Sequence, residues 1–131
     1  MIEIDGELSA RLAAAARSAM DFAYAPYSNF KVGAALLGRS GRIYAGCNIE
    51  NASFGATNCA ERTAIFKAVS EGEKEFDAIA IVSSSGKPTP PCGICRQVLS
   101  EFAPDIPILL VSSDGFVKTS LPELFGMPFD L

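Results

Sequence analysis

The chain carries the sequence NCAER at residues 58–62 and the sequence PCGIC at residues 91–95. In the second segment, Cys92 and Cys95 are three positions apart, which places two thiols on one turn of a helix. Cys59, from the first segment, can supply a third thiolate. Three protein ligands leave one tetrahedral position of a zinc ion open, as in catalytic rather than structural zinc sites. The pattern therefore predicts a catalytic zinc centre.

Glu61 lies two residues after the first of these cysteines, close enough to move protons for a water molecule at the metal. A different interpretation is that Asn58 caps a helix and that Glu61, three residues later, completes a capping box. The neighbouring zinc ligand favours the catalytic interpretation. The chain contains no histidine, so acid–base catalysis at this site cannot use an imidazole.

A Cys-x-x-Cys pair is a weak signal by itself, because it also occurs in thioredoxin-like redox pairs and in structural zinc sites. A redox pair usually follows a strand directly, whereas Cys92 follows a proline-rich loop. A closed structural site needs a fourth ligand, for which Cys47 is the spare cysteine. We expect Cys47 to be a small buried residue, since free cysteines are among the most buried residue types. A structural zinc protein or redox switch without turnover is the non-enzymatic alternative.

The charge of the predicted centre calls for a nearby cation. Three thiolates and one Zn²⁺ sum to −1, which weakens the metal as a Lewis acid. Cys59 and Cys92 are predicted at helix N-termini, where free N–H groups and the helix dipole stabilise anionic sulfur. Arg62 is the candidate that offsets the remaining negative charge of the centre, by donating hydrogen bonds to the thiolates. The alternative is that Arg62 is an ordinary solvated charge on the helix.

The composition fits one compact domain over residues 1–131, with 49% apolar and 20% charged residues. The net charge is −4, and lysine and arginine are scattered singly. Nucleic-acid binders display a basic stripe, so a small, weakly charged substrate is favoured and no nucleic-acid partner is expected. Apolar runs are too short to span a membrane, and the N-terminus does not resemble a secretory signal. We therefore expect a cytoplasmic protein, in which spaced cysteines bind metal rather than form disulfides.

The hydrophobic pattern predicts helices and strands in alternation. Helices are predicted over residues 8–23, 59–70, from 92 onward and over 122–125, and strands over 30–37, 43–49, 78–82, 108–111 and 116–119. The first helix is predicted to bury Leu8, Leu12, Ala15, Ala19 and Phe22. Turn signals at residues 40–41 and 114–115 indicate hairpins at both ends of the chain. The sequence thus predicts a layered α/β domain with a mixed sheet.

Taken together, residues 59–62 and 91–97 resemble the cytidine deaminases, in particular their small, single-domain, homotetrameric, zinc-dependent type. The C-x-E and P-C-x-x-C signature is an established mark of zinc nucleobase deaminases. The resemblance covers nearly the whole chain and includes segments 24–28, 30–35, 46–51, 59–72 and 123–129. It implies a three-layer cytidine-deaminase-like fold, with a mixed five-stranded sheet and helices packed on both faces.

The resemblance implies that Cys59, Cys92 and Cys95 hold one Zn²⁺ per chain and that Glu61 shuttles protons. The implied reaction, part of pyrimidine salvage, is hydrolytic deamination of cytidine and 2′-deoxycytidine to uridine and 2′-deoxyuridine, with release of ammonia.

The resemblance also implies a nucleoside-binding set. Asn48 and Glu50 would hydrogen-bond the ribose hydroxyls, Phe30 would pack on the pyrimidine, and the backbone of Ala60 would contact the edge of the base. An anionic carboxylate near the sugar repels a 5′-phosphate, so the free nucleoside is expected to be preferred over the nucleotide.

Two segments depart from the usual family pattern. Phe54 stands where tyrosine is common, and residues 125–129 read FGMPF where the family more often has Leu-Leu-Pro-x-x-Phe. Residues 121–131 are too apolar to remain in water. In the resembled family a tail aromatic closes the site of an adjacent subunit, so Phe129 is predicted to stack near the base held by another chain of a homotetramer.

Two further enzymatic alternatives remain open at this stage. The same chemistry could act on another aminopyrimidine nucleoside, such as the antibiotic blasticidin S, although Asn48 and Glu50 suit a ribose. An editing enzyme acting on polynucleotide is the other, and the acidic composition disfavours it.

Overall fold

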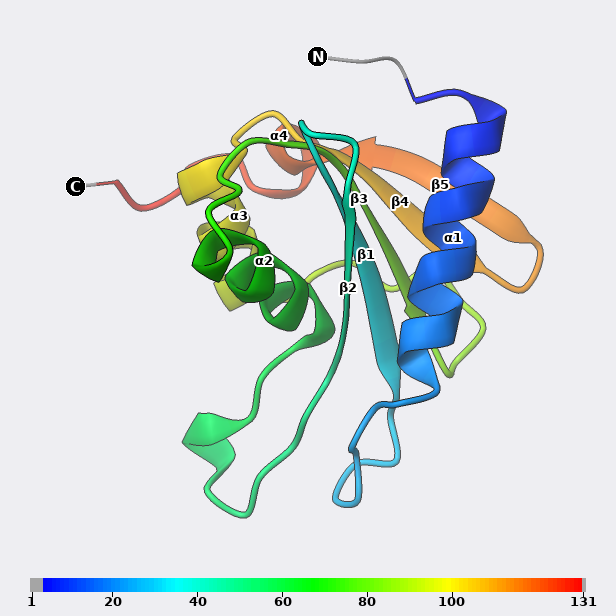
Figure 1. The fold of residues 1–131 in the computed structure, drawn as a ribbon. Coiled ribbons are helices and arrows are strands. Elements are labelled where there is room, and N and C mark those ends of the chain that lie inside the picture. The colour runs from blue at the N-terminus through cyan, green and yellow to red at the C-terminus, as the bar shows by residue number, and fades with distance from the viewer. Residues whose placement is uncertain (1–3, 131) are drawn as a thin grey trace.

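The computed structural model describes residues 4–130, in which helices and strands alternate along the chain (Figure 1). The elements are α1 (Gly6–Met20), β1 (Val32–Gly38), β2 (Ile43–Cys47), the 3-10 turn η1 (Phe54–Ala56), α2 (Ala60–Ser70), β3 (Phe76–Ser83), α3 (Gly93–Phe102), β4 (Pro107–Ser112), β5 (Gly115–Ser120) and α4 (Leu121–Leu124). No helix within residues 4–130 has the length and apolar character needed to cross a membrane. Residues 1–3 of the N-terminus, and Leu131 of the apolar tail over residues 121–131, lie outside the described residues.

The five strands of the described chain form one mixed sheet in the order β2-β1-β3-β4-β5. β1 pairs antiparallel with β2 and β3, and β5 pairs antiparallel with β4, whereas β3 and β4 are parallel. A parallel pair needs a crossover connection, and α3 supplies it. The predicted mixed five-stranded sheet, with a hairpin at each end, is confirmed.

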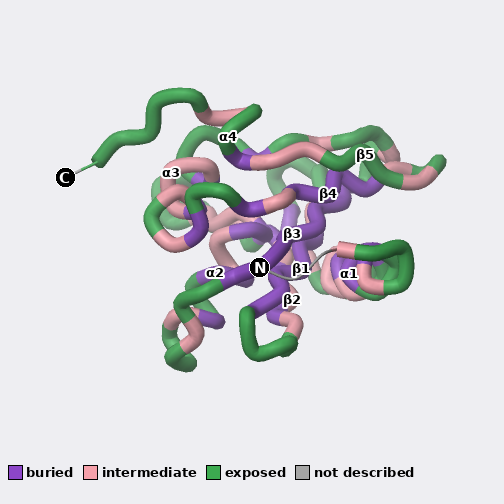
Figure 2. The backbone as a smooth tube through the Cα atoms, turned by 90° about the horizontal axis from the view of Figure 1, so that it is seen from above, coloured by how far each residue is buried: buried purple, intermediate pink, exposed green. Residues whose placement is uncertain are grey.

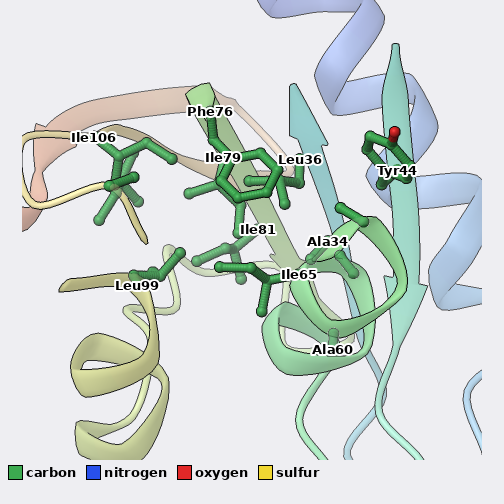
Figure 3. Packing of buried hydrophobic residues seen from close by; sticks show 14 of the residues in the cluster. Ala34, Leu36, Tyr44, Ala60, Ile65, Phe76, Ile79, Ile81, Leu99 and Ile106 are labelled. Atoms are coloured by element: carbon green, nitrogen blue, oxygen red, sulfur yellow. The ribbon is translucent and has the colours of Figure 1, made fainter. Parts of the chain in front are cut away.

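Helices cover both faces of the sheet, so the domain has three layers. Figure 2 shows α1 on one side of the buried strands and α2 and α3 on the other. One hydrophobic cluster lies between α1 and the sheet, and the other lies beneath α2 and α3. In the second cluster, Ile65 of α2 and Leu99 of α3 gather around Ile79 and Ile81 of β3 (Figure 3). Strand β3 is buried at every position, as expected for a strand that feeds both clusters.

The predicted buried face of the first helix is partly wrong. α1 ends at Met20, and Phe22, which was expected to be buried, is 81% exposed. The helix buries Ala13 and Ala16 in its place, which rotates its inner face. The cause is Gly33 of β1, where a Cβ atom would lie 2.0 Å from the Ala16 carbonyl oxygen. An alanine-rich helix has weak amphipathic character, so this close backbone approach decides which face is buried.

Strand β2 ends at Cys47, two residues earlier than predicted. Beyond it, Ile49 makes isolated bridges with Tyr24 on one side and Asn58 on the other. These bridges take the chain out of the sheet and hold it between the segment that follows α1 and the segment that precedes α2. The next residue, Glu50, is thereby placed close to residues 24–28.

The first two turns of α2 pack directly on β2 at Gly46. A Cβ atom at this position would lie 2.6 Å from the Ala64 nitrogen and 2.7 Å from the Ala60 oxygen, so any side chain forces the helix backbone away. We predict that Gly46→Ala lowers the free energy of unfolding by about 1 to 3 kcal/mol, the usual cost of overpacking. Urea denaturation followed by circular dichroism measures this.

Gly6→Ala is the matched control for that measurement, because a Cβ atom at Gly6 meets nothing within 4 Å. Its stability should change little. Equal midpoints for Gly46→Ala and the wild-type protein would show that α2 can move off the strand without cost.

Candidate active site

Three of the four cysteines converge at the starts of two helices. Cys59 is the N-cap residue of α2, Cys92 is the N-cap residue of α3, and Cys95 lies in the first turn of α3. Their sulfur atoms all lie within 4.8 Å of one another, and those of Cys59 and Cys92 are 3.7 Å apart. The structure thus brings together the three residues that the sequence pattern singled out.

The backbone around these sulfurs favours negative charge. Both N-cap cysteines have extended backbone conformations, with ψ of 157° at Cys59 and 171° at Cys92, so each helix begins immediately after its cysteine. The first N–H groups of a helix have no partner within the helix, and the positive end of its dipole adds to their effect. The starts of α2 and α3 therefore present partial positive charge to the sulfur atoms.

The thiols already share protons unequally. A hydrogen bond from Cys95, together with one from Arg62, lowers the pKa of Cys59 to about 5. The pKa of Cys95 rises instead, because its thiol donates to Cys59 and because the residue is buried. A metal ion replaces such thiol protons, and three sulfurs at this spacing suit a tetrahedral zinc ion with one open position. The donor set therefore fits Zn²⁺.

Arg62 lies against the thiols and is not a freely solvated charge. Its Nη2 donates to the Cys59 sulfur at 3.1 Å. Burial opposes its charge, but hydrogen bonds to Cys59 and Cys95 outweigh it and hold the pKa of Arg62 above its ordinary value. The guanidinium therefore supplies positive charge at the site where three thiolates would otherwise accumulate negative charge.

Glu61 is buried beside the thiols, with 5% of its surface exposed. Burial, reinforced by the negative charge of Cys59, raises the pKa of Glu61 to about 7. The capping-box interpretation does not hold, because the N-cap residue of α2 is Cys59 and not Asn58. The Asn58 amide instead donates to the Thr63 hydroxyl at 3.3 Å. Glu61 is thus a carboxyl group that can both take and give a proton near neutral pH.

A pocket of about 300 Å³ opens in front of Glu61. Its lining includes Cys59, Cys92 and Ala60 on the metal side and Phe30, Asn48 and Glu50 on the other side. Phe30 is 39% exposed, so its ring is available to a ligand. A volume of this size suits a small molecule.

The side chains on the far side of the pocket are held in place by the backbone. The Asn48 amide donates to the Phe30 carbonyl at 2.7 Å and accepts from the Val32 N–H at 2.8 Å. After these two bonds, one donor hydrogen and one lone pair of the amide remain free for a ligand. The Glu50 carboxylate accepts from the Tyr27 N–H at 2.9 Å and from the Ser28 hydroxyl. Hydrogen bonding, chiefly from Ser28, lowers the pKa of Glu50, which keeps it anionic.

Two predicted residues lie elsewhere in this chain. Cys47 is half-buried rather than buried, and it lines a separate, larger groove of about 480 Å³ between α1 and α2, together with Lys67 and Phe22. It does not join the group of three thiols. Phe129 is 69% exposed, and the structure does not place it in the lining of its own chain's pocket. Its backbone is held by the Gln97 side chain, through bonds of 2.8 and 3.0 Å.

Sequence reasoning missed some of the pocket. Ser28 and Thr89 both contribute to its lining. Ser28 lies between the predicted helix at 8–23 and the predicted strand at 30–37, within segment 24–28 of the family resemblance, and that resemblance was the available signal. Thr89 lies in the proline-rich loop, where its hydroxyl is 2.6 Å from that of Ser83, and no spacing rule connects such a loop to a pocket.

Known proteins of similar sequence and structure agree with a zinc site at these cysteines. Residues 7–110 match the cytidine and deoxycytidylate deaminase zinc-binding region, so the chain belongs to this deaminase family. A cytidine deaminase from Sporosarcina psychrophila is 50% identical over 121 residues, covering 91% of this chain and 89% of the relative. The crystal structure of a cytidine deaminase from Burkholderia pseudomallei has a TM-score of 0.87 at 46% identity, covering 92% of this chain and 98% of that one.

A more distant relative bears on the choice of substrate. A blasticidin-S deaminase from Bacillus cereus is 37% identical over 106 residues, covering 75% of this chain and 76% of the relative. This chain is therefore more similar in sequence to the Sporosarcina psychrophila cytidine deaminase than to the blasticidin-S deaminase. The cluster of three thiols agrees with the zinc-binding region of the family.

We predict that Glu61→Gln keeps its zinc and its fold but loses on the order of 10²- to 10⁴-fold in turnover, because a proton-transferring group is removed. Steady-state kinetics and metal analysis of the same sample measure both quantities. Glu7→Gln is the matched control, since Glu7 occupies the first turn of α1 as Glu61 does that of α2. A Glu61→Gln variant with more than about a tenth of wild-type turnover would contradict a proton-transfer role.

Proposed function

We propose that this protein catalyses the hydrolytic deamination of cytidine and 2′-deoxycytidine to uridine and 2′-deoxyuridine, with release of ammonia. The observation that carries the proposal is the buried Glu61 beside three clustered thiols, in a pocket lined on its other side by Asn48 and Glu50. Family membership supports the same reaction.

We assign Cys59, Cys92 and Cys95 as the residues that hold Zn²⁺, one per chain. When bound there, zinc supplies Lewis-acid chemistry that makes water nucleophilic near neutral pH. Arg62 donates to the thiolates and offsets the negative charge of the ligand set, which keeps them good ligands without excess charge on the centre.

Glu61 moves the two protons of the attacking water. It accepts the first proton as oxygen adds to C4 of the cytosine ring and passes that proton to N3. It then takes the second proton from the new hydroxyl and gives it to the amino group, which leaves as ammonia while the C4 carbonyl forms. The same carboxyl therefore serves as base and acid in turn, a role that suits its buried position.

The remaining pocket residues bind the nucleoside. Phe30 packs on the pyrimidine, and the Ala60 N–H contacts the base edge; both residues line the pocket, and Ala60 begins α2. Asn48 and Glu50 hydrogen-bond the ribose hydroxyls. Because hydrogen bonds from the Ser28 hydroxyl and from the backbone keep Glu50 anionic, the pocket disfavours a 5′-phosphate, and the free nucleoside is the preferred form.

The test is a spectrophotometric assay of cytidine, with and without a zinc chelator. We expect loss of cytidine absorbance that stops when zinc is removed and returns when zinc is restored. The substrate panel adds 2′-deoxycytidine, cytidine 5′-monophosphate, blasticidin S and single-stranded DNA. Turnover of the last three at rates equal to that of cytidine, or turnover unaffected by zinc removal, would overturn the proposal.

We also infer that residues 1–131 form one domain acting in cytoplasmic pyrimidine salvage, without a membrane or nucleic-acid partner. A single sheet shared by both hydrophobic clusters supports one domain. The four cysteines are all free thiols, which supports this location, because a reducing compartment keeps cysteines unpaired. The net charge of −4 gives no support to binding of polynucleotides.

We further propose a homotetramer in which Phe129 stacks near the base held by another chain's Glu61 and zinc. Phe129 and Met127 are 69% and 92% exposed, yet the backbone of Phe129 is held by Gln97. A fixed backbone with outward apolar side chains is suited to contact with another chain.

The shared site can be tested by mixing two weak variants, Glu61→Gln and Phe129→Ala, through co-refolding. If sites are shared, some assemblies join an intact Glu61 to an intact Phe129 from the other variant, and activity rises above the sum of the two parents. Each variant refolded alone is the control. Activity equal to that sum would mean that each site is built from one chain.

A further inference from the structure

Arg96, one residue beyond Cys95, reaches back toward the loop that leads into α3. Its Nε donates to the Pro91 carbonyl at 2.7 Å. Its Nη1 donates to the Leu124 carbonyl at 2.6 Å. One planar guanidinium therefore joins the loop before Cys92 to the end of α4.

The first of these bonds acts on a peptide unit of the thiol site. The Pro91 carbonyl belongs to the same rigid plane as the nitrogen and Cα of Cys92, since the peptide bond does not rotate freely. Fixing that carbonyl therefore fixes the direction from which Cys92 enters the helix. Cys92 itself is exposed, so packing around its side chain does little to hold it.

The second bond acts on the C-terminal segment. Leu124 is the last residue of α4, and the last carbonyls of a helix have no intrahelical partner. The next residue of α3, Gln97, holds Phe129 from both its donor and its acceptor atom. Two adjacent side chains of α3 thus hold the segment that follows β5.

We propose that Arg96 is a positioning residue that sets the Cys92 peptide and couples the metal centre to residues 121–130. The inference rests on the zinc site of the proposed function. A guanidinium is suited to this task because its donors are fixed in one plane and can serve two acceptors at once. A lysine ammonium in the same place carries the charge but lacks that fixed geometry.

The experiment uses zinc-loaded, full-length wild-type protein, Arg96→Met, Arg96→Lys and the control Arg42→Met. Arg42 also makes a 2.9 Å bond, to Glu71, but on a solvent-exposed surface. The first measurement is the rate at which zinc passes to an excess of a chromogenic chelator. The second is hydrogen–deuterium exchange of peptides covering residues 121–130, before and after zinc removal.

We expect Arg96→Met to release zinc on the order of 10-fold faster than the wild type, as for other residues that orient metal ligands. Arg96→Lys should be intermediate, and Arg42→Met should match the wild type. Removing zinc from the wild type should speed exchange in residues 121–130. In Arg96→Met that exchange should be fast with or without zinc, because the link is already broken.

Equal zinc-release rates for Arg96→Met and the wild type would overturn the inference. Hydrogen–deuterium exchange in residues 121–130 of the wild type that is the same with and without zinc would also overturn it. If Arg96→Met does not fold, Arg96→Lys decides by the same two measurements. A wild-type protein that takes up no zinc would overturn the proposed function itself, whereas zinc binding without any effect of Arg96 would overturn only this coupling.

Discussion

The structure depends on the close approach of α2 to the edge strand β2. At Gly46 the helix backbone occupies the space that a side chain would need. Because α2 begins immediately after Cys59, this contact fixes the distance of Cys59 and Glu61 from the sheet. Gly33 sets the distance of α1 on the opposite face in the same way. Two positions without side chains therefore set the spacing of all three layers.

The site then places charged groups where protein interiors usually exclude them. Glu61 is buried and Cys59 favours its anionic form, so repulsion between these two groups would be costly without compensation. The compensation comes from Arg62 and from the N-termini of two helices. Arg62 and both helix N-termini already adjoin the thiols, which is the arrangement expected of a preorganised site.

Local features were predictable from the sequence and long-range ones were not. The pairing of Cys92 and Cys95 followed from their spacing at a helix start, which is a property of a short segment, and the deaminase signature added Cys59. The exposure of Phe22 was missed because the burial of α1 is decided by Gly33, on another element. The bonds of the Asn48 amide to the backbone also depend on tertiary contacts that no motif encodes.

The placement of the thiols also affects the entropy of the unfolded chain. Cys59 and Cys92 are 33 positions apart, and the central strand β3 lies between them. An ion bound by both closes a loop that contains the middle of the sheet. A covalent crosslink around a loop of this size contributes about 3 to 4 kcal/mol in the chain-entropy model. An ion that dissociates on unfolding stabilises the folded chain through its binding free energy instead. The catalytic ion would thus also stabilise the folded chain. In cells short of zinc, the chain would unfold more readily and be degraded faster.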